Sequence, residues 1–219
     1  MNLFRKIAGV LIGTLIMGLG IAFFNLSSFG FDGLSCVVIC IQRILNVKYT
    51  IGYLIINLVF FLLMIVFLRK QIGIGTVINY LLTGVFSDIF MSLFYRIGLG
   101  YHNMVINIIF GLIGVFFLGL GIALYANANL GITPYDALPL IITNNVVLFG
   151  QKIKYHIARK IVDGSCILFG IVVGMLILGN RRLVGINTII SFIFVGYIVT
   201  FTSRYINKYI YQKDDKTFE

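Results

Sequence analysis

Long apolar runs without charge alternate with short polar connections along the whole chain. The runs over residues 51–68 and 104–133 contain no charged side chain. A helix of about 20 apolar residues crosses the hydrocarbon core of a bilayer, where backbone groups must bond to one another. The pattern therefore predicts an all-α, polytopic membrane protein. The partner that its apolar helices require is the lipid bilayer.

The chain also contains a version of itself. The sequence GLGIA at 18–22 returns at 119–123, an offset of 119 − 18 = 101 residues. The sequence IGIGTVI at 72–78 returns as VGINTII at 184–190, an offset of 184 − 72 = 112 residues. These blocks predict two tandem, pseudo-symmetric transmembrane repeats, 1–98 and 99–207, followed by a polar C-terminal tail over 208–219. Duplicated helical halves are typical of carriers that hold a site between the repeats.

Each repeat is predicted to contain four helical segments. They cover residues 7–26, 33–45, 51–68, 72–95, 104–127, 134–148, 157–178 and 183–207. Gly30 and Gly131 are expected at equivalent breaks before the second segment of each repeat.

The second segments are unusually short or interrupted. Only 10 uncharged residues separate Asp32 from Arg43, and the matching segment contains Pro139. The lengths favour six full spans plus two half-helices, which would make the repeats inverted. The alternative is eight full spans and parallel repeats. Lys and Arg divide 12 inside to 5 outside in the first topology and 13 to 4 in the second, so their distribution leaves both open.

The net charge of 17 − 7 = +10 comes from basic clusters between apolar runs. Such clusters orient a membrane protein with the positive side in the cytoplasm, so no nucleic acid is expected as a partner. The cluster of Lys152, Lys154, Arg159 and Lys160 is predicted to be cytoplasmic, together with both termini. The spacing Gly9-x-x-x-Gly13 also allows a homodimer. The chain contains no enzyme or cofactor motif, and its three cysteines are expected to pack as apolar residues rather than to bind a metal.

Acidic residues in an apolar chain are candidates for function. Thr133-Pro134-Tyr135-Asp136 predicts a helix start, with Thr133 as the N-cap and Asp136 bonding back to the amide of the cap. Asp32 and Ser35 hold the matching places in the first repeat. Two interpretations stay open. These residues cap two helices, or they also contact a substrate or a coupling ion, for which Asp136 would suit a proton or a cation.

A polar stripe follows one face of the fourth segment. Thr76, Tyr80, Thr83 and Ser87 have helical spacing, and Asn79 lies beside them. Such a stripe lines a cavity or bonds neighbouring helices. The second repeat retains Asn187 and Thr188, and Asp88 follows the stripe. Asp163 is expected to pair with Arg159, four residues earlier, at the membrane edge.

Two motifs resemble a known family. The sequence LGITPYDAL at 130–138 resembles the LG-x-x-PWD-x-L signature of the bacterial YczE/YyaS/YitT membrane family. The sequence GIGTVIN at 73–79, with Gly84 and Asp88, resembles its G-x-GT-x-x-N-x(4)-G-x(3)-D element. Tyr135 replaces the usual Trp, and Gly33 stands where the family has Pro. The resemblance implies a multi-pass protein of the bacterial inner membrane that is similar to transporters.

We therefore expect a permease or carrier of a small solute or ion, with its site between the two repeats. The alternative is a membrane-embedded scaffold without transport activity. The candidate substrate- or ion-binding residues are Asp136, Thr133, Asp32, Ser35, Thr76, Asn79, Thr83, Asp88, Asn187 and Thr188.

Overall fold

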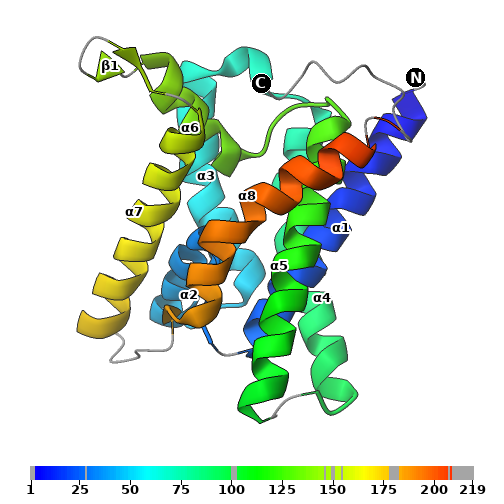
Figure 1. Ribbon diagram of the computed structural model, residues 1–219, viewed down its shortest axis with the longest axis vertical. Coiled ribbons are helices and arrows are strands. Elements are labelled where there is room, and N and C mark those ends of the chain that lie inside the picture. The colour runs from blue at the N-terminus through cyan, green and yellow to red at the C-terminus, as the bar shows by residue number, and fades with distance from the viewer. Residues whose placement is uncertain are drawn as a thin grey trace.

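The computed structural model describes residues 3–27, 29–99, 103–145, 147–148, 151–153, 155–177, 183–206 and 208. The helices in these residues are α1 (Leu3–Ser27), α2 (Gly33–Leu45), α3 (Tyr49–Phe67), α4 (Ile74–Arg96), α5 (Met104–Asn127), α6 (Pro134–Asn145), α7 (Tyr155–Leu176) and α8 (Ile186–Ile206). A 3-10 turn, η1 (Arg69–Gln71), precedes α4, and β1 (Val147–Leu148) pairs antiparallel with β2 (Gln151–Lys152). The predicted all-helical class is confirmed (Figure 1).

Six helices are long and two are short. Five of them, α1, α3, α4, α5 and α8, are long and apolar enough to cross a membrane, which confirms a multi-pass protein. Helix α7 has 22 residues but carries Arg159, Lys160 and Asp163 in its first half. Helices α2 and α6 have 13 and 12 residues, about 20 Å or less at 1.5 Å per residue, which is too short to cross. The expectation of two half-helices therefore describes this fold, and eight full spans do not.

The helix boundaries agree closely with the sequence pattern, and the differences have local causes. Helices α4 and α8 begin two and three residues later than predicted. In each, a threonine in the first turn accepts the amide of the glycine before the helix: Gly73 N to Thr76 Oγ1 at 3.1 Å, and Gly185 N to Thr188 Oγ1 at 3.2 Å. Helix α6 was predicted to reach residue 148 and ends at Asn145, because asparagines near its end compete for backbone groups.

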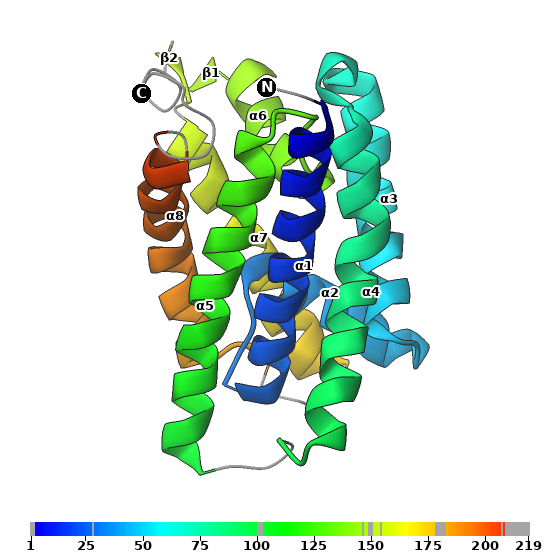
Figure 2. The ribbon, with the colours of Figure 1, turned by 90° about the vertical axis from the view of Figure 1, so that its right-hand side faces the viewer.

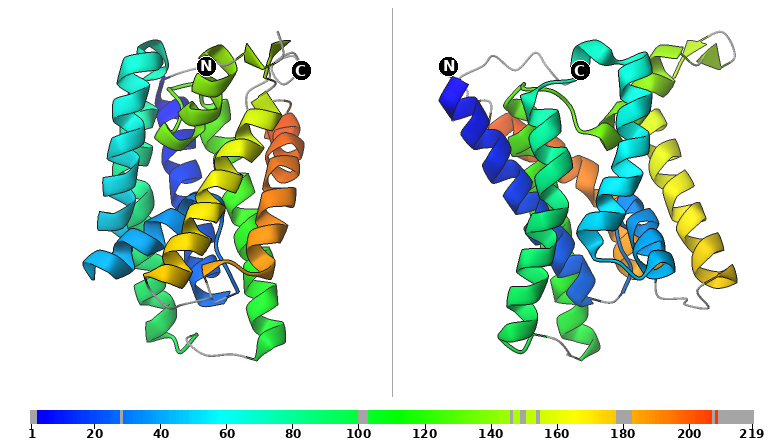
Figure 3. Two further views of the ribbon diagram at one scale, coloured as in Figure 1. Left: turned by 90° about the vertical axis from the view of Figure 1, so that its left-hand side faces the viewer. Right: turned by 180° about the vertical axis from the view of Figure 1, so that it is seen from behind.

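Corresponding helices of the two halves run in opposite directions (Figures 1, 2 and 3). Helices α1 and α4 descend in Figure 1, whereas α5 and α8 ascend; α3 ascends, whereas α7 descends. The short helix α2 lies toward the lower end and α6 at the upper end. Each long helix of residues 1–98 is thus antiparallel to the helix at the corresponding place in residues 99–207.

The helices pack as two groups of four, each drawn from both halves. In the α1/α4/α5/α8 group, α1 packs against α4 and α5, and α5 packs against α8. In the α2/α3/α6/α7 group, α2 and α6 each pack against both α3 and α7. Contacts of α3 with α4 and of α7 with α8 join the two groups.

Glycines bring the backbones of α1 and α5 into contact. A Cβ on Gly13 would lie 2.9 Å from Gly121 O, and a Cβ on Gly20 would lie 3.0 Å from Gly114 O. Any larger side chain at these places would force the helices apart. Gly13 therefore serves packing within the chain. The homodimer stays a prediction.

The break after α1 and the break after α5 make matching contacts. Gly30 has φ +104° and Gly131 has φ +114°, so both were correctly predicted at equivalent breaks. Phe29 O accepts Asn187 N at 3.1 Å, and Leu130 O accepts Gly75 N at 2.8 Å. These partners differ by 130 − 29 = 101 and 187 − 75 = 112, the two offsets of the repeat. Each break thus docks on the start of the last helix of the other half.

Candidate binding cavity

A cavity of about 60 Å³ lies between the two helix groups. A buried water needs roughly 10–15 Å³ measured in this way, so the cavity has room for a few waters or a small ion. The α1/α4/α5/α8 group contributes Met17, Ile21, Asn79, Thr83, Leu118, Ile122, Ser191, Phe192 and Val195. The α2/α3/α6/α7 group contributes Asp32, Gly33, Leu34, Ser35, Tyr53, Thr133, Tyr135, Asp136, Arg159, Asp163 and Ile167. Every charged lining residue belongs to this second group.

Both short helices begin at the cavity, because the chain returns to the interior after each break. Asp32 is the N-cap of α2, and its Oδ2 accepts Ser35 N at 3.3 Å. Thr133 caps α6, and its Oγ1 accepts Asp136 N at 3.0 Å. Pro134 starts α6, where a missing N–H costs nothing. The predicted caps are therefore confirmed, and the positive ends of two helix dipoles lie beside the cavity.

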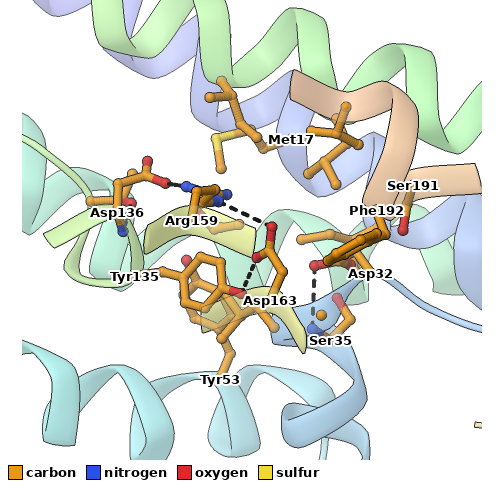
Figure 4. Close-up of a pocket in the computed structure, with 18 of the residues that line it drawn as sticks. Met17, Asp32, Ser35, Tyr53, Tyr135, Asp136, Arg159, Asp163, Ser191 and Phe192 are labelled. Carbon is orange, nitrogen blue, oxygen red and sulfur yellow. Dashed lines mark hydrogen bonds and ion pairs between the residues drawn. The ribbon is translucent and has the colours of Figure 1, made fainter. Parts of the chain in front are cut away.

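The carboxylate of Asp136 does not bond back to the Thr133 amide, so that half of the predicted capping box is wrong. It pairs instead with Nη1 of Arg159, from α7 (Figure 4). The guanidinium carries a full positive charge and the backbone amide does not, so its attraction to the carboxylate is stronger away from water.

Arg159 is the centre of a network. Its Nε donates to Asp163 Oδ2 at 3.3 Å, so the predicted pair exists. The other oxygen of Asp163 accepts the hydroxyl of Tyr135, whose ring lies 4.9 Å from the guanidinium carbon of Arg159. The side chains of Arg159, Asp136 and Asp163 are 24%, 18% and 20% exposed. The predicted pair thus belongs to a network that lines the cavity, and its position at the membrane edge stays a prediction.

Sequence reasoning missed Arg159, Asp163 and Tyr135 as cavity residues. It assigned Arg159 to a cytoplasmic cluster because Lys152 and Lys160 are near it in the sequence. The available signal was Asp136 itself, since a carboxylate in an apolar helix needs a cation, and Arg159 lies near the start of the next helix.

Asp32 differs from the other two carboxylates of the cavity. Its Oδ2 takes the Ser35 amide, whereas Oδ1 is buried and meets no hydrogen-bond partner among the residues that the structure describes. The Ser35 hydroxyl forms a hydrogen bond with the Tyr49 hydroxyl at 3.0 Å. Asp32 thus carries an unused acceptor at the cavity.

The polar stripe of α4 serves both of the predicted purposes. Asn79 and Thr83 line the cavity, and Asn79 Oδ1 accepts the Tyr53 hydroxyl at 3.3 Å. The Thr83 hydroxyl donates to the carbonyl of Asn79 in its own helix at 2.8 Å. Thr76 is fully buried outside the cavity lining, where it bonds the amide of Gly73.

The remaining candidates lie outside the cavity lining. Asp88 Oδ2 accepts the amide and the hydroxyl of Thr50, at 2.9 and 2.5 Å, and so caps α3 from a neighbouring helix. Asn187 and Thr188 are buried at the start of α8, where Asn187 Nδ2 donates to Ser27 Oγ at 3.0 Å. Ser191, one turn later, does reach the cavity.

The lining holds three carboxylates and one guanidinium, a formal balance of 1 − 3 = −2. The described residues contain no group of three or more His, Cys, Asp and Glu arranged for a metal ion. Cys36, Cys40 and Cys166 are buried and unpaired thiols. The lining thus carries a formal excess of negative charge.

The fold and the cavity define a multi-pass helical membrane protein with a charged interior. The chain matches the model of a family of unknown function, DUF6198, over residues 4–204, and it belongs to that family. No curated protein and no solved structure matches the chain significantly. Membership of the YczE/YyaS/YitT family stays a prediction.

Proposed function

We propose that this protein is a carrier for a small solute or ion and that the central cavity is its binding site. The observation that carries the proposal is the position of four ionisable side chains, Asp32, Asp136, Arg159 and Asp163, around a cavity where both short helices begin. Ionisable groups at membrane depth are costly and mark substrate or ion pathways. Helix starts that meet at mid-depth between two halves are the usual binding region of carriers.

A scaffold does not need these features. Helix caps and packing would be satisfied by neutral side chains, and Thr133 already supplies the cap of α6. Burying the charged groups of Asp136, Arg159 and Asp163 costs desolvation free energy. A protein that binds and releases a solute or ion has a use for such charges, whereas a scaffold has none. The cavity therefore supports a carrier over a membrane-embedded scaffold.

Alternating access would follow from movement between the helix groups. The breaks at residues 29–32 and 128–133 connect α1 to α2 and α5 to α6, and each crosses from one group to the other. We infer that the halves 1–98 and 99–207 are inverted repeats, since their breaks make the same contacts at the repeat offsets. Rocking of the α2/α3/α6/α7 group against the other would then expose the cavity to each side in turn.

The proposed setting is a bacterial inner membrane, with the start of α1 and the end of α8 in the cytoplasm. Arg5, Lys6, Arg69, Lys70 and Arg204 all belong to segments at this end (Figure 1). The positive-inside rule places such an end in the cytoplasm.

Reconstitution in liposomes tests the proposal. Labelled amino acids, organic acids, amines, sugars and inorganic ions would be offered with and without proton and sodium gradients. We expect uptake of one class above protein-free liposomes, and its loss in Arg159→Gln but not in Lys160→Gln, an exposed neighbour that does not line the cavity. Equal uptake in both variants would exclude the cavity as the site.

A further inference from the structure

We propose that Asp32 is a proton-binding site of the cavity and that a proton is the coupling ion of the carrier. The coupling role rests on the proposed function, whereas proton binding itself does not require a known substrate.

The three carboxylates of the cavity differ in whether a cation compensates them. Asp136 and Asp163 both pair with Arg159, and Asp163 also accepts the Tyr135 hydroxyl. Asp32 has no cation, and in the described part of the chain its buried Oδ1 has no hydrogen-bond donor. A buried ionised oxygen without a partner is strongly unfavourable. A ligand that supplies positive charge at Oδ1 removes this penalty.

The geometry favours a proton over a metal ion. Hard cations such as Ca²⁺ take six or more oxygen ligands, and Mg²⁺ demands a near-ideal octahedron. Around Asp32, the Ser35 hydroxyl is engaged with Tyr49, and the other two carboxylates of the cavity are engaged with Arg159. A single free carboxylate oxygen suits O–H bond formation better than ion coordination.

The binding step is simple. A hydronium ion that reaches the cavity breaks one of its O–H bonds and transfers the proton to Oδ1, where a new O–H bond forms. A neutral water and a neutral carboxylic acid remain. Oδ2 keeps the Ser35 amide, so no protein bond has to break. The formal charge of the lining changes from −2 to −1, and release on the other side restores the carboxylate.

The ionisable groups that face Asp32 come from four helices. Its own helix α2 contributes Cys36, and α3 contributes Tyr49 and Tyr53. Helix α6 contributes Tyr135, and α7 contributes Arg159, Asp163 and Cys166. The cavity-lining residues of α1, α4, α5 and α8 carry no ionisable group. The one cation among these groups, Arg159, is bonded to Asp136 and Asp163 rather than to Asp32.

Infrared spectroscopy of the protein in a lipid film, titrated with pH, tests the site directly. A protonated carboxylic acid has a carbonyl stretching band that the carboxylate lacks. All seven acidic side chains give such a band at low pH, so the informative band is the first to appear as the pH falls. We expect this first band in the wild-type chain, its loss in Asp32→Asn and its retention in Asp88→Asn. Asp88 is the matched control because it is a bonded carboxylate outside the cavity lining.

Asp32→Glu keeps the assignment testable if Asp32→Asn does not fold. The longer acid should move the frequency of the band without removing it. Three outcomes would overturn the proton site. The band could persist unchanged in Asp32→Asn or in Asp32→Glu, it could be lost equally in Asp88→Asn, or no band could titrate at all. Failure to find a transported solute would count against the carrier and would leave the infrared result standing.

Discussion

Arg159 satisfies two acids at once, and it is the side chain on which the charge balance of the cavity depends. It bonds Asp136 on another helix and Asp163 one turn along its own, above the ring of Tyr135. Neither acid has a second cationic partner in the described ion pairs. Loss of the guanidinium would therefore leave two carboxylates uncompensated at the same time.

We predict that Arg159→Gln lowers the free energy of unfolding substantially. The expected loss lies between the roughly 1 kcal/mol of an exposed pair and the roughly 3–5 kcal/mol of a fully buried one, because these groups are partly exposed. Thermal unfolding in detergent would measure it. Lys160→Gln, at an exposed position, is the control and should leave the midpoint unchanged. Equal midpoints for both variants would contradict a structural role of the network.

Asp136 and Arg159 should also be energetically coupled. Asp136→Asn keeps the cap, since the Asp136 amide still donates to Thr133 Oγ1, and removes only the pairing of charges. A double-mutant cycle with Arg159→Gln should give a coupling energy of about 1–3 kcal/mol in unfolding measurements. The two changes adding without coupling would show that the ion pair contributes nothing.

At the level of elements, the two breaks decide where the short helices begin. Gly30 and Gly131 both have positive φ and both press against a glycine–threonine turn of the opposite half. A Cβ on Gly30 would lie 2.5 Å from Gly185 N, and a Cβ on Gly131 would lie 2.7 Å from Gly73 N. The conformation and the space both exclude a larger residue, so α2 and α6 are positioned by their breaks as well as by their caps.

We predict that Gly30→Ala and Gly131→Ala each destabilise the fold by more than about 1 kcal/mol, the usual lower cost of a left-handed non-glycine residue. Gly196→Ala in α8 is the control, because nothing lies within 4 Å of its added Cβ. That change should be neutral or slightly stabilising through helix propensity. The comparison is of unfolding midpoints. If Gly30→Ala and Gly131→Ala leave the unfolding midpoint as little changed as Gly196→Ala does, the breaks are not tightly docked.

The whole molecule has an arrangement that single-residue labelling can test. With six long and two short helices, Lys48 and Ile97 face one side of the membrane and Gln71 the other. All three positions are exposed. In a chain whose three cysteines are replaced, Lys48→Cys and Ile97→Cys should react with a membrane-impermeant maleimide in intact cells. Gln71→Cys should react only after permeabilisation. The reverse pattern would contradict the proposed orientation, in which the start of α1 lies in the cytoplasm.

Much of this architecture could be predicted from local sequence. The uncharged runs determine membrane-spanning helices, because a backbone in hydrocarbon must bond to itself. The bounds Gly33–Leu45 and Met104–Asn127 were predicted correctly, since Asp32 and Asn103 directly precede the apolar stretches they open. The repeat offsets placed Gly30 and Gly131 at equivalent breaks, because a shared local pattern imposes a shared backbone conformation.

The cavity network was decided by tertiary structure alone. Arg159 is 159 − 136 = 23 residues from Asp136, and only the packing of α6 against α7 turns it away from a cytoplasmic cluster toward that acid. The sequence offered Asp136 two acceptable partners, the Thr133 amide and an unknown cation. Local chemistry favours the amide, whereas burial beside a guanidinium favours the ion pair, since charged groups attract more strongly away from water. Which helix faces which is a property of the assembled bundle, and so is the cavity that results.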